Sequence, residues 1–331
     1  MRARLERYAN HLWYETPCPP WFWRMLSALH GIVLGSRWQR PDGHPPVPVI
    51  VVGNLAVGGS GKTPTVIALA RYLTGLGLQT AVISRGYGGD RGAGSGKRPV
   101  RVNPESDPGV CGDEPVLIAQ QSAVPVWVCR DRRAAMDAAV AAGAGVIVSD
   151  DGLQHRGLAR SFEIVLIDGR RRFGNGWLLP AGPLRQPLKR LEQVDAVLFR
   201  GPDEQIAATE QYFELRPEAL VRLDDDARLD PDALAGSAVS AVAGIAHPGQ
   251  FVRSLEALGQ QPTLHAFPDH HAFVAGDLEG IPAPIVTTAK DAVKLRRLKP
   301  LPTGIHVLEV SAALPEALLQ SVAAHVQQFG Q

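Results

Sequence analysis

The chain has 331 residues, enough for two domains that each bury a hydrophobic core. Its hydrophobic content of 45% and charged content of 20% are ordinary for a soluble globular protein. The formal net charge of +1 provides no overall basic field, so composition argues against a nucleic-acid partner. The cysteines Cys18, Cys111 and Cys129 show neither paired nor metal-ligand spacing, and we expect free thiols in a reducing compartment.

The first forty residues differ in composition from the rest. They hold four of the six tryptophans, and six arginines against two acidic residues. Their apolar run, WFWRMLSALHGIVLG (21–35), is shorter than the ~20 apolar residues of a bilayer span. Tryptophan and arginine beside an apolar stripe are typical of an interfacial helix, so residues 1–40 are expected to form an amphipathic membrane-interface segment. A helix packed on the protein's own core, with arginines reaching solvent, would have the same composition.

From residue 47 onward, short β-branched runs alternate with helix-compatible stretches. This alternation predicts an α/β fold with a doubly wound, mostly parallel sheet and helices on both faces. The expected strands are 48–52, 80–84, 124–128, 145–150, 163–168 and 195–199, and the expected helices are 63–77 and 131–143.

The pattern weakens over residues 213–235, which we expect to be a linker or hinge. This segment would divide a first domain, residues 41–212, from a second, smaller α/β domain, residues 236–331. The glycine-rich stretch 86–99 is expected to be a mobile loop. In the second domain we expect a strand at 238–246, a helix from 249, a strand and helix within 284–298, and a final helix near 315–328.

The stretch VVGNLAVGGSGKTP (51–64) has the order strand, glycine loop, helix. Backbone N–H groups of such a loop surround a phosphate, the lysine neutralises phosphate charge, and the threonine hydroxyl reaches Mg²⁺. Ala56 stands where the P-loop pattern has its first glycine, although the later glycines still allow close backbone approach. The pattern predicts a P-loop NTPase-like domain whose phosphate site is formed by Gly58, Gly59, Ser60, Gly61, Lys62 and Thr63. A simple glycine turn is the structural alternative.

Two acidic residues follow the apolar run GVIVS at 145–149. A P-loop enzyme needs an acid at the end of a neighbouring strand to hold its metal ion. We therefore expect Asp150 and Asp151, with Thr63, to form a Mg²⁺ site. Paired acids at a strand end can instead cap the next element. The residues alone thus indicate a nucleoside triphosphate and Mg²⁺, and leave the acceptor open.

A set of further motifs is similar to the tetraacyldisaccharide 4'-kinase family of lipid A biosynthesis. These motifs occur in order over nearly the whole chain: VGNLAVGGSGKTP (52–64), SRGYGG (84–89), GDEP (112–115), DDGLQH (150–155), LLPAGPLRQP (178–187), FPDHHAF (267–273) and TTAKDAVK (287–294). The resemblance implies transfer of the ATP γ-phosphoryl group to the 4'-hydroxyl of tetraacyldisaccharide 1-phosphate. Residues 41–212 would then be the P-loop kinase domain.

The resemblance also implies catalytic roles for Asp113 and His270, with Lys62 in the P-loop. Asp113 would be the base and His270 its orienting partner, since an ordinary aspartate is a weak base. We infer that the pair is completed when the domains close about a hinge near 213–235. The residues alone favour a different role for Asp113, as the cap of a helix beginning near Glu114. Asp269, His270 and His271 could suggest a metal site, although adjacent histidines seldom ligate one ion.

Other residues are candidates for the acceptor side of the site. The expected substrate contacts are Arg85, Tyr87, Gln154, His155 and Arg185. Family members commonly carry glutamate after the last of these, where this chain has Gln186. The junction TTAKDAVK could support a nucleotide base or simply begin a helix.

An acceptor with four acyl chains resides in a bilayer, which favours the membrane-interface interpretation of residues 1–40. We expect peripheral attachment to the cytoplasmic face of the bacterial inner membrane, with ATP and Mg²⁺ as cofactors, the lipid A disaccharide precursor as substrate, and no obligate protein partner. The rival functions are a P-loop ATPase or GTPase that transfers phosphate to water, and a non-catalytic nucleotide-gated protein held at a membrane. Neither rival accounts for the full set of motifs.

Overall fold

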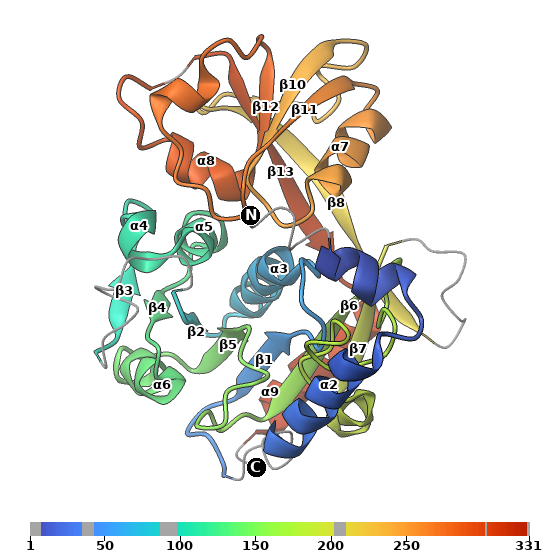
Figure 1. The fold of residues 1–331 in the computed structure, drawn as a ribbon. Coiled ribbons are helices and arrows are strands. Elements are labelled where there is room, and N and C mark those ends of the chain that lie inside the picture. Colours follow the sequence, from blue (N-terminus) through green and yellow to red (C-terminus); the bar gives the residue numbers. More distant parts are fainter. Residues whose placement is uncertain (1–7, 35–42, 87–97, 202–209, 302, 330–331) are drawn as a thin grey trace.

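The fold was established from a computed structural model, which describes residues 8–34, 43–86, 98–201, 210–301 and 303–329. The chain order alternates strands and helices through most of its length (Figure 1). The strands are β1 (Val49–Gly53), β2 (Thr80–Ser84), β3 (Val100–Val102), β4 (Val126–Val128), β5 (Val146–Asp150), β6 (Phe162–Asp168), β7 (Ala196–Arg200), β8 (Gln211–Arg222), β9 (Arg228–Leu229), β10 (Ala238–Ala243), β11 (Gln261–Ala266), β12 (Ile285–Thr288) and β13 (Ile305–Ala313).

Helices cover both faces of the sheet, as the sequence predicts. The α-helices are α2 (Trp21–Leu34), α3 (Lys62–Gly75), α4 (Pro108–Cys111), α5 (Asp113–Ser122), α6 (Arg132–Ala141), α7 (Pro248–Ala257), α8 (Ala289–Leu295) and α9 (Glu316–Gln328). The chain also forms a π-helical turn, η1 (His11–Glu15), and the 3₁₀ turns η3 (Leu188–Gln193) and η4 (Ala275–Leu278).

The strands form one continuous path in the order β11-β10-β12-β13-β8-β7-β6-β1-β5-β2-β4-β3. Strand β1 lies between β5 and β6 and is parallel to both. The carboxyl ends of these strands therefore meet at one edge of the sheet, which is where open α/β sheets bind ligands. The predicted doubly wound, mostly parallel sheet is confirmed.

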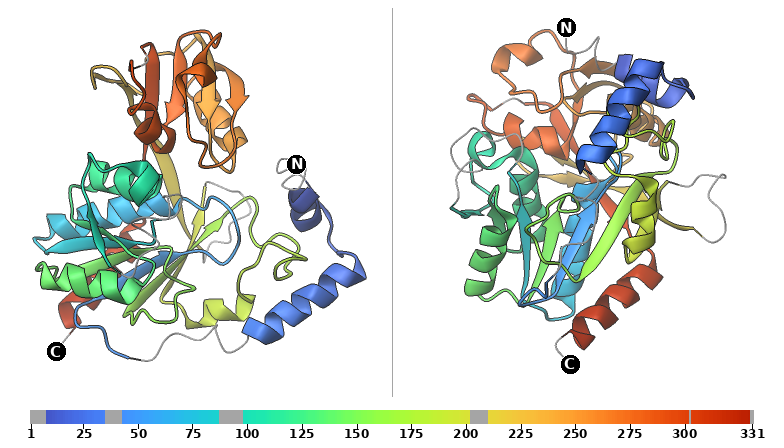
Figure 2. Two further views of the ribbon diagram at one scale, coloured as in Figure 1. Left: turned by 60° about the vertical axis from the view of Figure 1, so that its left-hand side comes forward. Right: turned by 60° about the horizontal axis from the view of Figure 1, so that its bottom comes forward.

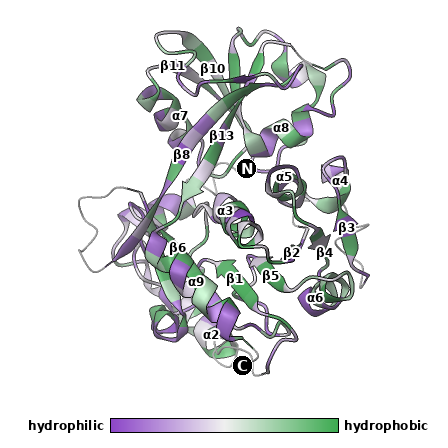
Figure 3. Cartoon of the chain, turned by 180° about the vertical axis from the view of Figure 1, so that it is seen from behind, coloured by the Kyte–Doolittle hydropathy of each residue, from purple (hydrophilic) through white to green (hydrophobic). Residues whose placement is uncertain are grey.

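The central strands β1 and β5 are buried along their whole length, and both begin with an apolar run (Figure 3). Ile50 and Val52 pack with α3, α5 and α9, whereas Val49 and Val51 pack with α6 on the opposite face. This two-sided burial explains why these strands appear in the sequence as continuous β-branched runs rather than as an alternating pattern.

The segment predicted as a linker is mostly strand. Most of β8 falls within 213–235, and β8 pairs with β7 at its start and with β13 over most of its length. The molecule has a first unit that contains β1 to β7 and a second unit that contains β10 to β12. The antiparallel pair of β8 and β13 joins them, and Figure 1 shows these two strands running from one unit to the other. Only four residues of β8 are buried, and they do not alternate regularly with exposed ones, which accounts for the weak sequence signal.

The sequence pattern assigns the last helix to the second unit, but in the structure this helix packs on the first unit. Leu318 and Val322 of α9 are buried in the same cluster as Ile50 and Phe162 of the first unit. After β13 the chain returns beneath the first unit, and Figure 1 places α9 beside the strands of that unit, far from α8. The second unit therefore comprises β10 to β12, α7 and α8, with the adjoining ends of β8 and β13.

Helix α2 lies at the outside of the molecule (Figure 2). Its side chains are inverted relative to an ordinary surface helix, because Ser27 is buried and the large apolar residues are exposed. The exposed set is Trp21, Phe22, Met25, Leu26, Leu29, Ile32 and Val33. These seven side chains therefore do not pack on the protein's own core, contrary to the alternative interpretation of the sequence. In the described part of the chain, no helix is long and apolar enough to cross a bilayer.

A buried ion cluster ties the start of β6 to its neighbours. Glu163 is fully buried and contacts Nε of Arg160 at 2.9 Å and Nη2 of Arg190 at 2.5 Å. We expect Glu163→Ala to lower the free energy of unfolding by about 3–5 kcal/mol, because it leaves two buried guanidinium groups without their carboxylate. Urea denaturation measures this loss.

Glu214→Ala is the matched control, because Glu214 pairs with Arg216 at the surface. A surface ion pair contributes about 0–1 kcal/mol. Equal losses in the two variants would contradict a structural role for the buried cluster.

Candidate active site

The loop between β1 and α3 has the geometry of a phosphate cradle. Gly58 (φ +129°) and Gly61 (φ +86°) adopt backbone conformations that favour glycine, and Gly61 is the N-cap of α3. The helix begins at Lys62, so its free N–H groups and dipole face the loop. The predicted order of strand, glycine loop and helix is confirmed at residues 49–75.

Ala56 is accommodated because its position needs no glycine. It forms a bridge with Leu184, and Val57 donates from its backbone N to the carbonyl of Pro183 at 2.9 Å. The motif LLPAGPLRQP therefore runs beside the P-loop and braces its first half. Ala56 is not among the residues with positive φ, so a side chain there brings no backbone strain.

The two predicted acidic metal ligands, Asp150 and Asp151, lie at the end of β5, next to the P-loop. Asp151 contacts Nζ of Lys62 at 3.7 Å and Nη1 of Arg185 at 3.3 Å. Burial raises the pKa of Asp151, but the charges of these cations outweigh burial and hold its pKa below the usual value. Burial raises the pKa of Asp150 to about 7, helped by the negative charges of Glu114 and Asp151.

Asp150 carries an unsatisfied oxygen. Its Oδ2 accepts from Oγ of Ser84 at 3.1 Å, whereas Oδ1 is buried and has no hydrogen-bond partner. A raised pKa and a buried oxygen without a partner fit a carboxylate that a cation would stabilise. Among the described residues no group of three or more His, Cys, Asp and Glu could hold a metal ion. A Mg²⁺ here fits the usual pattern of one or two carboxylates completed by phosphate oxygens and water.

Asp113 and His270 meet across the two units of the molecule. Asp113 is the first residue of α5, and Nδ1 of His270 lies 3.1 Å from its Oδ1 and 3.0 Å from its Oδ2. The cap of α5 is Gly112, and Asp113 accepts locally only from the backbone N of Glu114. The carboxylate thus points to the second unit rather than serving only as a helix cap.

Lysines of α8 surround this pair. Nζ of Lys294 lies 3.4 Å from Oδ2 of Asp113, and Nζ of Lys290 lies 3.1 Å from Oε1 of Glu114. Burial raises the pKa of Asp113, but the hydrogen bond with His270 and the lysine charges outweigh it, and the net pKa is lowered. The hydrogen bond to Asp113 raises the pKa of His270 against the opposing effect of burial.

Both Asp151 and His270 adopt left-handed backbone conformations, with φ of +50° and +61°. This region costs a residue other than glycine about 1–2 kcal/mol. Such strain is retained where the surrounding structure enforces it, and it concentrates at functional sites. The backbone thus holds one strained residue at the predicted metal site and one in the predicted catalytic pair.

The predicted acceptor residues are distributed around the same edge. Arg85 follows β2 and is exposed, while Tyr87 lies outside the described residues. Nε2 of Gln154 donates to the backbone carbonyl of Asn54 at 2.9 Å. Burial and the charge of Arg132 lower the pKa of His155. Gln154 and His155 thus adjoin the P-loop and the acidic pair.

Gln186 does not orient the arginine beside it. Its side chain is buried, and its Oε1 lies 3.4 Å from Nε2 of Gln154, whereas Arg185 pairs with Asp151. With glutamine at position 186, Arg185 therefore still has a carboxylate partner.

The remaining alternatives are decided by local contacts. Nε2 of His271 lies 2.9 Å from Oδ2 of Asp277, and its ring stacks on Phe267, so it does not share a site with His270. Thr288 is the N-cap of α8 and accepts from the backbone N of Asp291 at 3.2 Å. The motif TTAKDAVK therefore begins a helix, which is one of the two roles that the sequence left open for it.

Sequence reasoning missed two partners of the site. Arg132 is buried and donates from Nη2 to the carbonyl of Asp150 at 2.7 Å. Lys294 neutralises Asp113, although it lies at the end of a motif that the sequence singled out. A lone arginine after a short strand carries no signal by itself. Lys294 could have been found from its spacing, because it lies four residues after Lys290 and therefore on the same face of α8.

Comparisons with known proteins agree with this geometry. The sequence profile of the tetraacyldisaccharide-1-phosphate 4'-kinase (LpxK) family matches residues 20–327. The tetraacyldisaccharide 4'-kinase of Alkalilimnicola ehrlichii is 46% identical over 299 residues, covering 87% of this chain and 88% of that protein. That of Alcanivorax borkumensis is 42% identical over 329 residues, covering 96% and 97%.

A solved structure has the same fold. LpxK from Aquifex aeolicus in complex with ATP superimposes with a TM-score of 0.69 at 27% identity, covering 92% of this chain and 96% of that one. The resemblance drawn from the motifs is confirmed, as are the fold class and the kinase function. The chain belongs to the tetraacyldisaccharide-1-phosphate 4'-kinase family, the ATP-dependent kinases of lipid A biosynthesis.

Proposed function

We propose that this chain phosphorylates the 4'-hydroxyl of tetraacyldisaccharide 1-phosphate through Asp113, with His270 holding that carboxylate in place. The observation that carries the proposal is the contact of Nδ1 of His270 with both carboxylate oxygens of Asp113, at 3.1 and 3.0 Å. Because its pKa is lowered, Asp113 is ionised at neutral pH and can accept the hydroxyl proton as phosphoryl transfer proceeds.

The P-loop is the proposed site for the phosphate tail of ATP. Residues 58–63 would surround phosphate with backbone N–H groups, and Lys62 would neutralise charge on it. Thr63, Asp150 and Asp151 would hold Mg²⁺, which supplies charge neutralisation to the transferring phosphoryl group when bound. Lys62 already contacts Asp151, so one cationic side chain connects the two parts of the site.

The acceptor is proposed to approach from the side of β5 and β2. Arg85, Gln154, His155 and Arg185 lie on that side of the P-loop, and Tyr87 follows Arg85 in the sequence. An arginine fork suits sugar and phosphate oxygens, which makes Arg85 and Arg185 the proposed polar contacts.

Helix α2 is proposed to dock on the cytoplasmic face of the inner membrane, where ATP and the lipid acceptor meet. Its exposed face carries Trp21, Met25, Leu29 and Ile32, with exposures between 56% and 78%. Apolar side chains facing outward while Ser27 is buried favour a non-aqueous partner for this face. The segment would hold the enzyme at the surface of the bilayer that contains its substrate.

Asp113→Asn should reduce transfer of label from γ-labelled ATP to tetraacyldisaccharide 1-phosphate by roughly 10²–10⁴-fold in kcat, because it removes the proton acceptor. His270→Ala should reduce kcat less, since the carboxylate remains. The kcat of both variants is measured from the label recovered in the lipid extract after incubation with the detergent-dispersed acceptor. Asp137→Asn, which alters an exposed acid on α6, is the control. A wild-type kcat for Asp113→Asn would refute the assignment, and label released only as phosphate would favour the ATPase alternative.

The Asp113–His270 contact should make stability depend on pH. The pKa of His270 is raised in the folded protein, so its contribution is fully present below its unfolded pKa of ~6.5 and is lost as pH rises through the folded value. Thermal melts of wild type and His270→Asn should therefore differ most near pH 6 and converge toward pH 9. A difference that stays constant over this range would contradict the charged pair.

Glutamate substitutions on α2 should release the protein from membranes. We expect Trp21→Glu combined with Ile32→Glu to reduce partition onto vesicles of anionic phospholipid by roughly tenfold or more, because two apolar anchors are replaced by charges that the lipid repels. Vesicle flotation measures the bound fraction. Leu264→Glu, at an exposed position on β11, is the control. Unchanged flotation of the α2 variant would exclude α2 as the docking surface.

A further inference from the structure

A second group of charged residues lies on the opposite flank of the P-loop, beside β6 and β7. Asp168 ends β6 and Arg200 ends β7, and a turn after β6 carries Arg171. His247 and Gln250 reach this group from the start of α7 in the second unit. None of these residues has a part in the phosphoryl transfer proposed for Asp113 and His270.

An ion pair and hydrogen bonds connect the side chains of Asp168, Arg200 and Gln250. Arg200 forms an ion pair with Asp168 and donates from Nη2 to Oε1 of Gln250 at 2.8 Å. Nε2 of Gln250 donates to Oδ2 of Asp168 at 3.0 Å, and Oδ1 of Asp168 accepts from the backbone N of Arg171. The carboxylate of Asp168 is therefore fully engaged.

Arg171 has a positive charge but no such partner. Its Nη1 lies 3.1 Å from Nε2 of His247 and 3.5 Å from Oδ1 of Asn10, and its guanidinium lies 4.8 Å from the ring centre of Tyr14. Within the described part of the chain, no carboxylate lies at ion-pair distance from it. By contrast, Lys62, Arg185, Lys290 and Lys294 each contact a carboxylate.

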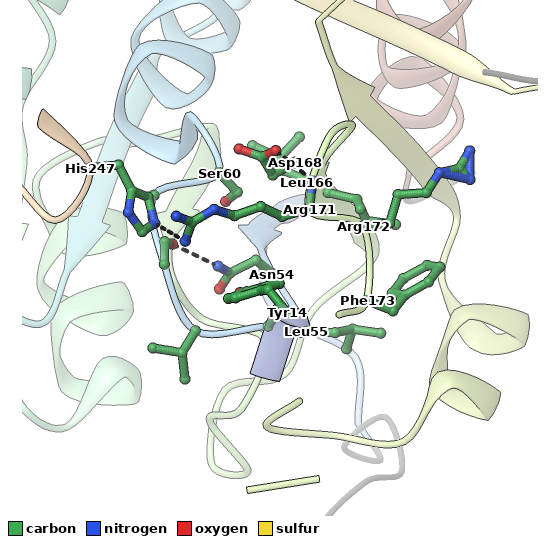
Figure 4. Close-up of a pocket in the computed structure, with 15 residues that line it drawn as sticks. Tyr14, Asn54, Leu55, Ser60, Leu166, Asp168, Arg171, Arg172, Phe173 and His247 are labelled. Carbon is green, nitrogen blue, oxygen red and sulfur yellow. Dashed lines mark hydrogen bonds between the residues drawn. The ribbon is translucent and has the colours of Figure 1, made fainter. Parts of the chain in front are cut away.

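This half-buried guanidinium lies against the phosphate cradle. Figure 4 shows Arg171 extending from its turn across a pocket toward His247, with Asn54 and Ser60 of the loop nearby. The imidazole packs directly on the loop, since a Cβ placed on Gly58 would lie 2.9 Å from Nε2 of His247. The cavity they leave, about 20 Å³, is large enough for about one water molecule.

We propose that Arg171 contacts the phosphate tail of the bound nucleotide and that His247 is the residue that positions it. The inference rests on the proposed role of the P-loop as the ATP site. A guanidinium without a carboxylate partner can bind an anion without first breaking an ion pair, and its planar fork matches phosphate oxygens. P-loop enzymes use such an arginine to stabilise charge on the phosphoryl group that is transferred.

The state of His247 fits a positioning role. Burial and the charge of Arg171 lower the pKa of His247 to about 4, so the ring is neutral at physiological pH. A neutral ring leaves Nε2 free to accept the hydrogen bond from Arg171. His247 comes from the second unit and Tyr14 from the N-terminal segment. Arg171 contacts both, so this one side chain connects the two segments beside the phosphate loop.

Equilibrium binding separates this role from catalysis. MgATP and AMP would be titrated, by competition with a fluorescent ATP analogue, into wild type, Arg171→Ala, Arg171→Lys and the control Arg170→Ala. Arg170 is adjacent, exposed and of equal charge. We expect Arg171→Ala to weaken MgATP by roughly ten- to a hundredfold, the effect of losing a charged hydrogen bond. AMP affinity, and both affinities of Arg170→Ala, should stay within about twofold of wild type.

Conservative variants test the positioning role. Arg171→Lys, which keeps the charge without the fork, should lose less MgATP affinity than Arg171→Ala. His247→Ala should weaken MgATP by about threefold to tenfold, and His247→Gln should restore it, because the glutamine Oε1 can accept the same hydrogen bond. Melting temperatures of all variants show whether each is folded.

Three outcomes would overturn the proposal: wild-type MgATP affinity in Arg171→Ala, equal weakening of MgATP and AMP, or equal weakening in Arg170→Ala. Lys62→Ala tests the underlying assignment separately. If Lys62→Ala retained wild-type MgATP affinity, the P-loop would not be the ATP site and both proposals would fall. Loss in Lys62→Ala with none in Arg171→Ala would refute the role of Arg171 alone.

Discussion

The antiparallel pairing of β8 with β13 is the constraint on which the active site depends. These two strands belong to both units, so the second unit is held by the same sheet that carries the P-loop. A flexible linker would leave the loop with His270 free to drift. The strand pair instead places that loop over the carboxyl edge of the sheet, where His270 contacts Asp113 at 3.0 Å. The proposed catalytic pair is thus a product of sheet pairing as well as of hydrogen bonding.

Around that pair, the site is organised by the cost of burying charge. Asp113 is compensated by His270 and Lys294, and Asp151 by Lys62 and Arg185. Among the groups that the described residues leave incompletely compensated are the buried Oδ1 of Asp150 and the guanidinium of Arg171. One is negative and the other positive, and they occur on opposite flanks of a loop built to receive phosphate. This pattern fits a site whose electrostatic balance is completed by a metal ion and a polyanion.

The surface of α2 also has groups that the protein itself leaves uncompensated, and here they are apolar side chains exposed to solvent. Helix α2 buries Ser27 and exposes Trp21 and Ile32, the reverse of what water favours for an isolated protein. Such a face is a cost in aqueous solution and becomes favourable against a lipid surface. A kinase whose acceptor carries four acyl chains would benefit from residing there. In the proposed function, the polar sugar of the substrate would face the P-loop edge and its acyl chains would lie in the bilayer on which α2 docks.

Local patterns in the sequence were sufficient to predict the P-loop, the acids at the end of β5 and the helices on either side, because each depends on residues within one strand–loop–helix unit. Asp113 and His270 were paired only through the family resemblance, since 157 positions separate them. The role of β8, the return of α9 to the first unit and the contact of Arg171 with His247 were decided by tertiary structure. Each depends on which distant segments share a sheet or a face, and burial between such segments leaves no periodic mark in the sequence of either one.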